Sequence, residues 1–396
     1  MKNSFLLAVA FLALTVVGAP EITNVSVSQD ASRRVTVKYD MPDDAAVVTV
    51  EFKTNGVAVS SAAACGFEGD ADALVAAGMD RTFTWQPRSA MPEMKLPPES
   101  LQVVLTAWDV NNLPPYMVLD LTATNRVRYY ASAEALPGGQ GVTNILFKKD
   151  RLLMFKAPAC NATFRMGSAI GETANRNRDY VHNVTFTEDF YIGVYELTQG
   201  QLNHFVSNNN YEPVGECYPV NKTSYDDMRG TQYSWPGDGH KVADTSLLKL
   251  MRGRTGVELD LPTDAQWEFA CRAGCPGRWN NGEWNSAAIT NVAVCSSNGG
   301  NAPHVVGTKQ PNSWGLYDFH GNVWEWCLDW NQNVLTNDET DPKGPSGPLD
   351  GNYRVVRGGS YYRDYNYCRA GHRNNNPSST RNKEYGIRLA CPAVAR

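Results

Sequence analysis

The alternation of apolar and polar side chains between residues 21 and 122 constrains the fold more than any other feature of the chain. In residues 35–41, "VTVKYDM", every second side chain is apolar, and this period places alternate side chains on opposite faces of a β-sheet. Further candidate strands lie at residues 48–53, 81–87, 101–110 and 116–123. Asn55-Gly56 supplies the positive φ angles of a tight hairpin turn. About seven strands in such a length are typical of an immunoglobulin- or fibronectin-like β-sandwich, which we predict over residues 20–125.

The N-terminus has the pattern of a signal peptide. One lysine precedes a largely apolar run from Phe5 to Val17, which is too short to cross a bilayer but suits the hydrophobic region of a signal peptide. We therefore expect residues 1–19 to be removed and the protein to be secreted, periplasmic or held at the cell surface. A buried strand or a short helix is the alternative. No second apolar stretch is long enough to cross a membrane, so a membrane-spanning protein is not expected.

The charge balance bears on the class of partner. The chain has 41 acidic and 36 basic residues and a net charge of −5. Its basic residues form no continuous stripe that could neutralise a series of phosphates. We therefore do not expect nucleic acid as a partner.

The cysteine content indicates disulfide bonds. Nine cysteines in an exported chain would meet an oxidising environment. Cys65 stands alone in the first part of the chain. The other eight are Cys160, Cys217, Cys271, Cys275, Cys295, Cys327, Cys368 and Cys391. An even set of eight permits many pairings, and sequence spacing alone does not choose among them.

A change in composition separates two domains. Residues 132–144, "SAEALPGGQGVTN", are rich in glycine and small side chains, which is typical of a linker. We place the linker at residues 126–149 and a second domain at residues 150–396.

The second domain contains two helix starts. Thr198 with Gln201 and Thr263 with Gln266 each fit a capping box, in which both side chains satisfy amides at the start of a helix. We expect Gly274 to end the second helix in a left-handed conformation. Long stretches rich in asparagine, glycine, tryptophan and tyrosine surround the helices, so little regular structure is expected.

Six segments of the second domain form an ordered set: "FRMGS" (164–168), "FYIGVYELTQGQ" (190–201), "LPTDAQWEFACRAG" (261–274), "GLYDFHGNVWEW" (315–326), "RVVRGGSY" (354–361) and "YGIRLAC" (385–391). Together they resemble the formylglycine-generating enzyme family, also called sulfatase-modifying factors, over residues 150–396. The resemblance implies a compact α+β fold, similar to C-type lectins, with little regular structure. It also implies an activity, the oxidation of a sulfatase cysteine to formylglycine with O₂.

The resemblance also implies a copper site, in which two thiolates hold one Cu(I), a soft ion that prefers sulfur ligands. Aligned on the Gly-Gly-Ser segment that ends at Ser360, the second thiolate falls on Cys368 and the first on Arg363. A guanidinium has no lone pair to donate, so Arg363 cannot replace a thiolate. If the chain is nevertheless catalytic, Cys368 and Ser360 are the catalytic candidates and copper is the cofactor.

Two disulfides follow from the same resemblance. Cys327 comes directly after the "WEW" strand, which lies beside the Gly-Gly-Ser loop in the family, so a bridge from Cys327 to Cys368 is expected. Family enzymes join the helix that contains Cys271 here to the end of the chain, which suggests a bridge from Cys271 to Cys391.

Family structures hold Ca²⁺ at the segment "DFHGNVWEW". The ligands map onto the side chains of Asp318 and Glu325 and the carbonyls of Gly321 and Val323. Hard oxygen ligands at this spacing suit Ca²⁺, and we expect modest affinity because only two are carboxylates. The alternative is a hairpin turn in which Glu325 is solvated.

The Gly-Gly-Ser loop is aromatic and cationic. Tyr361, Arg363, Tyr365 and Arg369 lie in it, and Trp324 is on the neighbouring strand. Flat rings and guanidinium groups suit sugars, carboxylates or sulfate, so these five residues are the candidate ligand-binding set. In the alternative, the tyrosines pack beneath the loop and the arginines are solvated.

Two functions remain open, and whether the chain is an enzyme is undecided between them. The favoured one is a secreted, non-catalytic family member, a calcium-supported module that binds carbohydrate or an extracellular protein or peptide. The alternative is a formylglycine-generating oxidoreductase that has lost or relocated one copper ligand. The six histidines are scattered without zinc-site spacing, and no hydrolase elbow or phosphate loop occurs.

Overall fold

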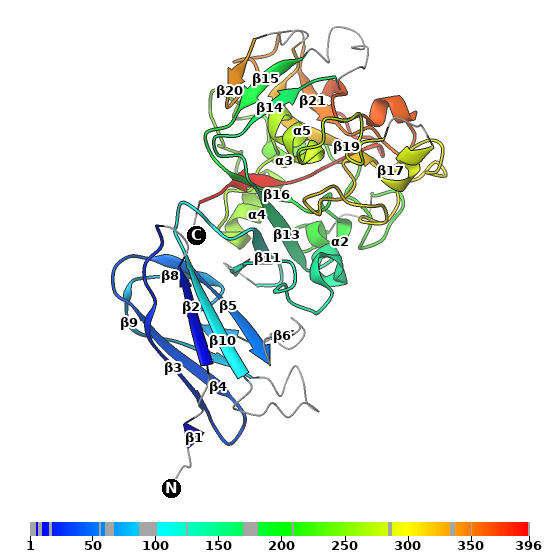
Figure 1. Ribbon diagram of the computed structural model, residues 1–396. Coiled ribbons are helices and arrows are strands. Elements are labelled where there is room, and N and C mark those ends of the chain that lie inside the picture. The colour runs from blue at the N-terminus through cyan, green and yellow to red at the C-terminus, as the bar shows by residue number, and fades with distance from the viewer. Residues whose placement is uncertain are drawn as a thin grey trace. The chain divides into compact units, whose positions relative to one another are not determined.

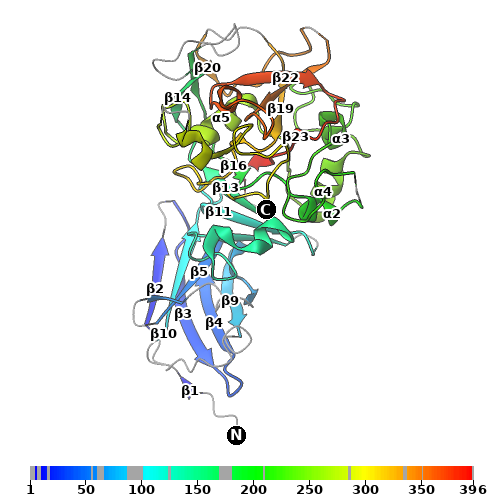
Figure 2. The same ribbon diagram turned by 90° about the vertical axis from the view of Figure 1, so that its right-hand side faces the viewer.

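The computed structural model describes residues 5–6, 10–15, 18–54, 57–59, 67–86, 101–123, 126–168, 181–207, 210–283, 287–332, 337–349 and 351–394. The chain divides into two compact units, drawn in Figure 1 and, after a quarter turn, in Figure 2. Unit 1 comprises residues 1–119, 127–146 and 393–396. Unit 2 comprises residues 120–126 and 147–392.

Unit 1 contains two sheets of mainly antiparallel strands. The first has the order β1-β3-β4-β9-β7, with β1 (Phe5–Leu6), β3 (Thr23–Gln29), β4 (Val35–Met41), β9 (Gly78–Trp85) and β7 (Phe67–Gly69). The second has the order β2-β10-β5-β6 with β8 also beside β5, and contains β2 (Ala10–Thr15), β10 (Leu101–Trp108), β5 (Ala46–Thr54), β6 (Val57–Ala58) and β8 (Ala73–Val75).

One hydrophobic core joins the two sheets of unit 1. Val37 on β4 and Trp85 on β9 pack in the same buried cluster as Val48 and Phe52 on β5 and Leu105 on β10. The ring centroids of Phe52 and Trp85 lie 4.1 Å apart. The period-two pattern therefore marks the inner face of each sheet, as expected for half-buried strands.

Two sequence predictions fall at the edges of these sheets. Thr54 on β5 pairs with Val57 on β6, one residue either side of Asn55-Gly56, which itself lies outside the described residues. Residues 10–15, within the predicted signal peptide, form β2 and pair parallel to β10. The signal peptide stays a prediction.

The predicted linker contains regular structure. Strand β12 (Val127–Tyr130) pairs antiparallel with β11 (Tyr116–Asp120), and two 3₁₀ turns follow, η2 (Gly141–Thr143) and η3 (Ile145–Lys148).

Unit 2 consists mostly of short strands with few helices. Its strands are β13 (Arg151–Ala157), β14 (Thr163–Met166), β15 (His182–Thr185), β16 (Phe190–Gly193), β17 (Ala293–Val294), β18 (His320–Gly321), β19 (Trp324–Trp330), β20 (Glu339–Thr340), β21 (Tyr353–Arg357), β22 (Arg373–Pro377), β23 (Tyr385–Gly386) and β24 (Ala390–Pro392). Strand β16 lies between β13 and β24, and a four-stranded sheet has the order β22-β21-β19-β23. Figure 1 shows β24, in red, returning to the green β16, so the end of unit 2 packs against its beginning.

The helices of unit 2 are α2 (Gln199–Asn203), α3 (Tyr225–Arg229), α4 (Leu247–Thr255) and α5 (Asp264–Arg272), and its 3₁₀ turns include η4 (Ala288–Asn291) and η5 (Tyr365–Cys368). Both predicted capping boxes are confirmed, at Thr198 for α2 and at Thr263 for α5. The left-handed turn at the end of α5 begins one residue earlier than predicted, at Ala273, and Gly274 also has a positive φ, of 84°. Among the described residues, no helix is long and apolar enough to span a membrane.

Buried ion pairs tie the loops of unit 2 together. Arg357 at the end of β21 binds Asp264 and, at 2.8 Å, Glu268, both on α5. Arg272 binds the other oxygen of Glu268 at 2.8 Å, and Arg373 on β22 binds Asp264 at 2.6 Å. These side chains are buried, so each charge depends on its partner.

The two disulfides implied by the resemblance are not formed. None of the eight cysteines in the described residues is bonded to another. The Cys327 thiol on β19 lies among Asp264, Arg357 and Asp329, whereas Cys368 packs in a different cluster with Cys295.

The second expected pair is separated in the same way. Cys271 on α5 faces His320, with 3.7 Å between its sulfur and the Nε2 atom. Cys391 lies on β24 opposite Tyr191. The expectation was wrong because tertiary packing directs these side chains to different neighbours.

Candidate functional site

The Gly-Gly-Ser loop begins where β21 ends. Gly358 and Gly359 have φ angles of 94° and 80°, a region that side chains other than hydrogen disfavour. A Cβ atom on Gly359 would lie 2.6 Å from the Cys368 sulfur. The second glycine is therefore needed both for the turn and for the close approach of Cys368.

Ser360 and Arg363 share one carboxylate. The buried Ser360 hydroxyl donates to Glu384 at 2.8 Å, and Arg363 Nε donates to the same carboxylate oxygen at 2.9 Å. The Arg363 side chain is 38% exposed. Glu384 therefore fixes the guanidinium that stands where the resemblance places the first copper thiolate.

Cys368 is fully buried at the end of η5. Burial raises the pKa of its thiol well above the usual value, and the neighbouring Cys295 thiol raises it further. Trp279, Ile289 and Val292 pack in the same cluster. A neutral thiol and a paired guanidinium do not supply the two thiolates of the family copper site, so these residues do not fit the ion as the sequence aligns them.

Cys295 is a residue of this region that the sequence did not single out. It precedes a turn whose Ser296 amide donates to the Arg363 carbonyl at 2.9 Å, which holds the two segments together. The only sequence signal for Cys295 was that it belongs to an even set of cysteines. That signal does not identify the residue that Cys295 contacts.

The predicted ligand-binding residues differ in exposure. Trp324, Tyr361 and Arg369 are buried beneath the loop, and burial raises the pKa of Tyr361 to about 12. Tyr365 is half-buried and packs against Trp279, with 6.2 Å between ring centroids. Of the two arginines in this set, Arg363 is the more accessible, with 38% of its side chain exposed.

Two tyrosines outside that set are the exposed aromatic groups of the loop. Tyr362 is 56% exposed and Tyr367 is 43% exposed. Tyr367 also packs edge-on against His372, with 5.2 Å between ring centroids. The exposed side chains of the loop are therefore Tyr362, Asp364 and Tyr367, and Arg363 is half-buried between them.

The predicted calcium segment places three acidic side chains near one another in the interior. Asp318 precedes β18, Glu325 is on β19, and Glu196 follows β16. Glu196 accepts the Asn322 side-chain amide at 2.6 Å and the Val323 backbone amide at 3.2 Å. Burial raises the pKa of Glu196 well above its usual range, and the charges of Asp318 and Glu325 add to the shift.

One guanidinium partly balances this negative charge. Arg388 binds both oxygens of Glu325, with a shortest distance of 2.7 Å, and the Trp267 indole donates to Glu325 at 2.5 Å. Burial raises the pKa of Asp318 to about 6, although the Gly307 amide donates to it at 2.6 Å. The charge of Lys148 also lowers the pKa of Asp318, and three buried carboxylates beside Arg388 and Lys148 leave an excess of acidic groups.

The donor types of these residues suit a calcium ion, which would share the Glu325 carboxylate with Arg388. Carboxylate and carbonyl oxygens are the ligands that Ca²⁺ prefers, and a cation would compensate the excess of carboxylates. No three His, Cys, Asp or Glu side chains of the described residues converge as metal ligands. An ion here would therefore need backbone carbonyls, as the resemblance implies for Gly321 and Val323. Glu196 was missed by the sequence prediction, although a charged residue in the apolar run "FYIGVYEL" is a signal of a buried carboxylate.

Backbone hydrogen bonds connect the calcium segment to the Gly-Gly-Ser loop. The Gly321 amide donates to the Gly358 carbonyl at 2.7 Å, and the Tyr361 amide donates to the Asn322 carbonyl at 2.8 Å. The order of one segment therefore depends on the order of the other.

A histidine makes a further connection between them. His320 Nε2 accepts the Asn280 backbone amide at 3.0 Å, so the proton is on Nδ1, which donates to the Cys368 carbonyl at 2.7 Å. Burial lowers the pKa of His320 to about 4, which keeps the ring neutral.

Comparison with known proteins gives one matching family model, the sulfatase-modifying factor enzyme 1-like domain, over residues 161–393. The formylglycine-generating enzyme of Streptomyces coelicolor is 35% identical over 153 residues, which are 33% of this chain and 46% of that enzyme. The formylglycine-generating enzyme of Mus musculus is 27% identical over 279 residues, which are 59% of this chain and 74% of that enzyme.

Other similar proteins have different names. The serine/threonine-protein kinase pkn1 of Chlamydia pneumoniae is 36% identical over 132 residues, 33% of this chain and 20% of the kinase. The chain thus spans less than half the length of the Chlamydia and Streptomyces relatives. A solved structure, Treponema denticola variable protein 1, is 26% identical and covers 61% of this chain and 95% of its own, with a TM-score of 0.49.

Proposed function

Because the chain belongs to the sulfatase-modifying factor enzyme 1-like family, with the domain at residues 161–393, we propose that it is a secreted, non-catalytic member that binds a carbohydrate or an extracellular protein or peptide. The ion pair of Arg363 with Glu384 is the observation that supports this proposal. It fixes a cation where the family chemistry requires a soft, electron-donating ligand.

The loop is suited to binding in this reading. Tyr362 and Tyr367 offer flat amphipathic surfaces, and Arg363 offers hydrogen-bond donors in a fixed direction. The buried Tyr361 and Trp324 support the loop from beneath, which reduces the entropy lost when a ligand binds.

An array of glycans and peptides tests this binding function. We expect the full chain to bind a subset of the array, and Tyr362→Ala with Tyr367→Ala to weaken that binding. Tyr353→Ala, at another exposed tyrosine in unit 2, is the matched control. Binding that survives the double substitution would contradict the placement of the ligand on this loop.

A turnover assay tests the absence of catalysis. The full chain is supplied with copper, O₂ and a cysteine-containing sulfatase peptide, and formation of an aldehyde is followed by mass spectrometry. We expect no aldehyde, whereas a formylglycine-generating enzyme run in parallel should produce it. Turnover that is lost in Cys368→Ser would overturn the proposal.

The alternative function, a formylglycine-generating oxidoreductase, is supported by one observation. Cys295 lies in the same buried cluster as Cys368, so a second sulfur is at hand although Arg363 replaces the aligned one. If this alternative holds, Cys295→Ser and Cys368→Ser should each abolish turnover in the same assay. Cys160→Ser, which changes an exposed thiol, should leave turnover unchanged.

We further propose that Asp318 and Glu325, with the carbonyls of Gly321 and Val323, hold a Ca²⁺ ion that supports the loop. The excess of buried carboxylates supports this, and the bound ion would supply the compensating charge. The backbone hydrogen bonds to Gly358 and Tyr361 would transmit the resulting order to the binding surface.

Calorimetric titration and thermal unfolding test the calcium proposal. We expect heat on adding Ca²⁺, a lower melting temperature in chelator, and a smaller response in Asp318→Asn. Asp226→Asn in α3 is the control. If the melting temperature is unchanged in chelator and no calorimetric heat is measured, the calcium site is refuted.

The last part of the proposal concerns the role of unit 1. We infer that it is an immunoglobulin- or fibronectin-type sandwich that acts as a spacer, because two sheets share one core.

A further inference from the structure

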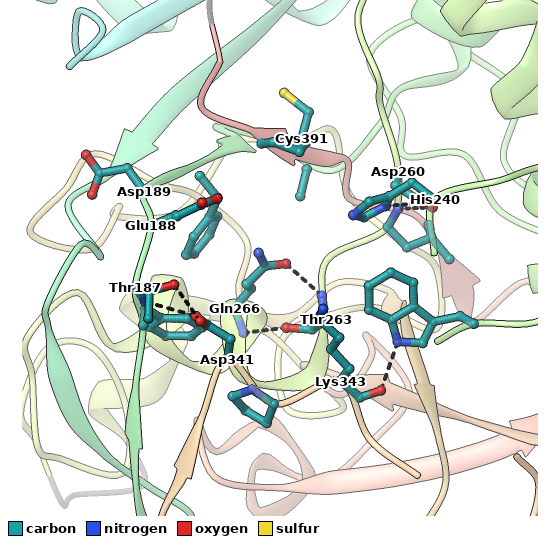
Figure 3. Close-up of a pocket in the computed structure, with 17 residues that line it drawn as sticks. Thr187, Glu188, Asp189, His240, Asp260, Thr263, Gln266, Asp341, Lys343 and Cys391 are labelled. Carbon is teal, nitrogen blue, oxygen red and sulfur yellow. Dashed lines mark hydrogen bonds and ion pairs between the residues drawn. The ribbon is translucent and has the colours of Figure 1, made fainter. Parts of the chain in front are cut away.

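Unit 2 contains a cavity of about 300 Å³ that none of the residues of the Gly-Gly-Ser loop lines (Figure 3). This volume is at the small end of the range for ligand pockets, which begins near 300 Å³. Its wall is built by the segment before β16, the segment after β20, the start of α5, the loop that contains Trp235 and His240, and the end of β24.

Three of the acidic side chains in the wall are already engaged. Asp189 accepts the amides of Ala159 and Cys160 at 2.8 Å each. Asp341 accepts the amide and the hydroxyl of Thr187, at 2.9 and 2.5 Å. These hydrogen bonds fix the Asp189 and Asp341 carboxylates in the wall of the cavity. They also occupy oxygens that a ligand would otherwise contact.

The third engaged acid, Asp260, orients a histidine. Asp260 is buried and also binds Arg229 and, at 3.2 Å, Arg252. Burial opposes its ionisation, but the hydrogen bond from His240 and the charge of Arg229 lower the pKa of Asp260, so it is a carboxylate. His240 Nδ1 lies 2.8 Å from this carboxylate and must donate to it, so Nε2 of an uncharged His240 ring is an acceptor.

Gln266 supplies a hydrogen-bond donor that complements this acceptor. The Gln266 side-chain oxygen accepts the Thr263 amide at 2.9 Å in the capping box of α5, which fixes the direction of the side-chain nitrogen. Figure 3 shows this side chain in the middle of the labelled residues. Within the described part of the chain, Gln266 Nε2 and His240 Nε2 have no hydrogen-bond partner.

The charges of the wall are mixed. Glu188 and Lys343 line the cavity with opposite charges, and neither has an ion-pair partner among the described residues. Because an anionic ligand would meet the carboxylates and a cationic ligand would meet Lys343, the wall is uniformly attractive to neither. A neutral ligand that both donates and accepts hydrogen bonds is therefore favoured.

Aromatic side chains form the apolar part of the wall. Phe186, Phe190 and Trp235 line it, and Trp235 is held by the hydrogen bond of its indole to the Lys343 carbonyl at 2.9 Å. The Trp235 and His240 ring centroids lie 5.0 Å apart with their planes inclined by 49°, so the two rings form an angled surface. Such a surface suits the C–H groups of a compact ring.

We propose that this cavity is a binding site for a single neutral sugar ring, with His240 Nε2 accepting from and Gln266 Nε2 donating to its hydroxyl groups. Each hydroxyl can donate and accept, which matches the two groups and the mixed charge of the wall. The site is separate from the loop of the proposed function, and either can fail without the other.

Ligand-observed NMR with the full chain tests the proposal. The probes are glucose, galactose, mannose and N-acetylglucosamine, with putrescine as a cation and citrate as an anion. We expect at least one neutral sugar to bind at about millimolar concentration, as a few hydrogen bonds in a small pocket allow, and the two charged probes not to bind.

Two variants identify the cavity as the site. Gln266→Glu keeps the oxygen of the capping box but removes the donor, and His240→Ala removes the acceptor. Each should weaken sugar binding about tenfold, as expected for one lost hydrogen bond of the stronger kind. Tyr353→Ala, at an exposed tyrosine in neither the cavity nor the loop, is the control and should leave the affinity unchanged; Tyr362→Ala is measured beside it to detect binding on the loop. Melting temperatures within a few degrees of the parent would show that the variants are folded.

Several outcomes would overturn the inference. The first is that no sugar binds up to about 10 mM, which is beyond the expected range. The second is that putrescine or citrate binds and no sugar does. The third is that both cavity variants still bind the sugar. Sugar binding lost only in Tyr362→Ala would place the sugar on the loop, which supports the proposed function and refutes this site.

Discussion

Arg388 shows how single residues hold the interior of unit 2 together. Its guanidinium binds Glu325 and donates at 2.8 Å to the carbonyls of Gly193 and Tyr317, and it lies 3.9 Å from the centre of the Phe319 ring. All of these contacts are buried. A charge in such a place is tolerated only because each guanidinium nitrogen donates to a partner.

We expect Arg388→Leu to lower the free energy of unfolding by about 3–5 kcal/mol, because it leaves Glu325 as an unpaired buried carboxylate. Arg381→Ala is the control, since Arg381 is 59% exposed and pairs with Asp227 at the surface. That change should cost at most about 1 kcal/mol. Urea denaturation measures both, and equal losses in the two variants would contradict the argument.

A buried carboxyl group in unit 1 should make stability depend on pH. Burial raises the pKa of Asp72 to about 7, and the Val50 amide at 3.1 Å opposes this only in part. The folded state therefore holds a proton that the unfolded state releases near its ordinary value. The resulting stabilisation is complete below about pH 4 and is lost as the pH rises to about 7, with a magnitude of up to about 4 kcal/mol.

Asp72→Asn should remove this loss, because an amide does not ionise and can still accept from the Val50 amide. The variant should gain stability relative to the parent between pH 5 and pH 8, as followed by scanning calorimetry. Asp43→Asn, at an exposed position, should show no such gain. A constant difference between Asp72→Asn and the parent across this range would refute the assignment.

At the scale of elements, the turn from β18 into β19 positions the calcium segment. Gly321 has a φ of 80°, and a Cβ atom there would lie 1.9 Å from the Val294 carbonyl oxygen on the paired strand β17. Strand β19 follows at once and is buried along its whole length. The turn therefore fixes Asp318 and Glu325 relative to each other.

Two alanine substitutions separate the backbone strain from the steric clash. Gly315 also has a positive φ, of 76°, but no atom lies within 4 Å of its Cβ position. Gly315→Ala should cost about 1–2 kcal/mol from the left-handed backbone alone. Gly321→Ala should cost about 1–3 kcal/mol more because the strands must separate. Thermal unfolding measures the difference, and equal costs would show that β17 yields without penalty.

At the scale of the whole molecule, the N-terminal segment is the part that processing would change. Strand β2 ends the second sheet of unit 1, where it pairs with β10. The described core of unit 1 draws on residues from Ile22 onward. Strand β10 keeps its pairing with β5 along its full length when β2 is removed.

We therefore expect a chain that begins at Pro20 to melt within a few degrees of the full chain, because the buried side chains from Ile22 onward and the pairing of β10 with β5 are kept. Mass spectrometry of the exported protein should find an N-terminus close to this residue. A much lower melting temperature in the shortened chain would mean that β2 belongs to the folded unit and that residues 1–19 are not a signal peptide.

The sequence by itself determined the features that depend on near neighbours. The strands of unit 1 follow from alternation along a few residues, and the starts of α2 and α5 follow from side chains three positions apart. The ordered motifs likewise identified the family, because they are read along the chain.

Only the tertiary structure decided which distant residues meet. It placed Cys295, rather than Cys327, with Cys368, and it added Glu196 to Asp318 and Glu325. It also placed His240 beside Asp260, in a cavity that no motif indicated. The physical reason is that burial and pairing depend on the packing of segments far apart in the chain, and local side-chain patterns carry no information about that packing.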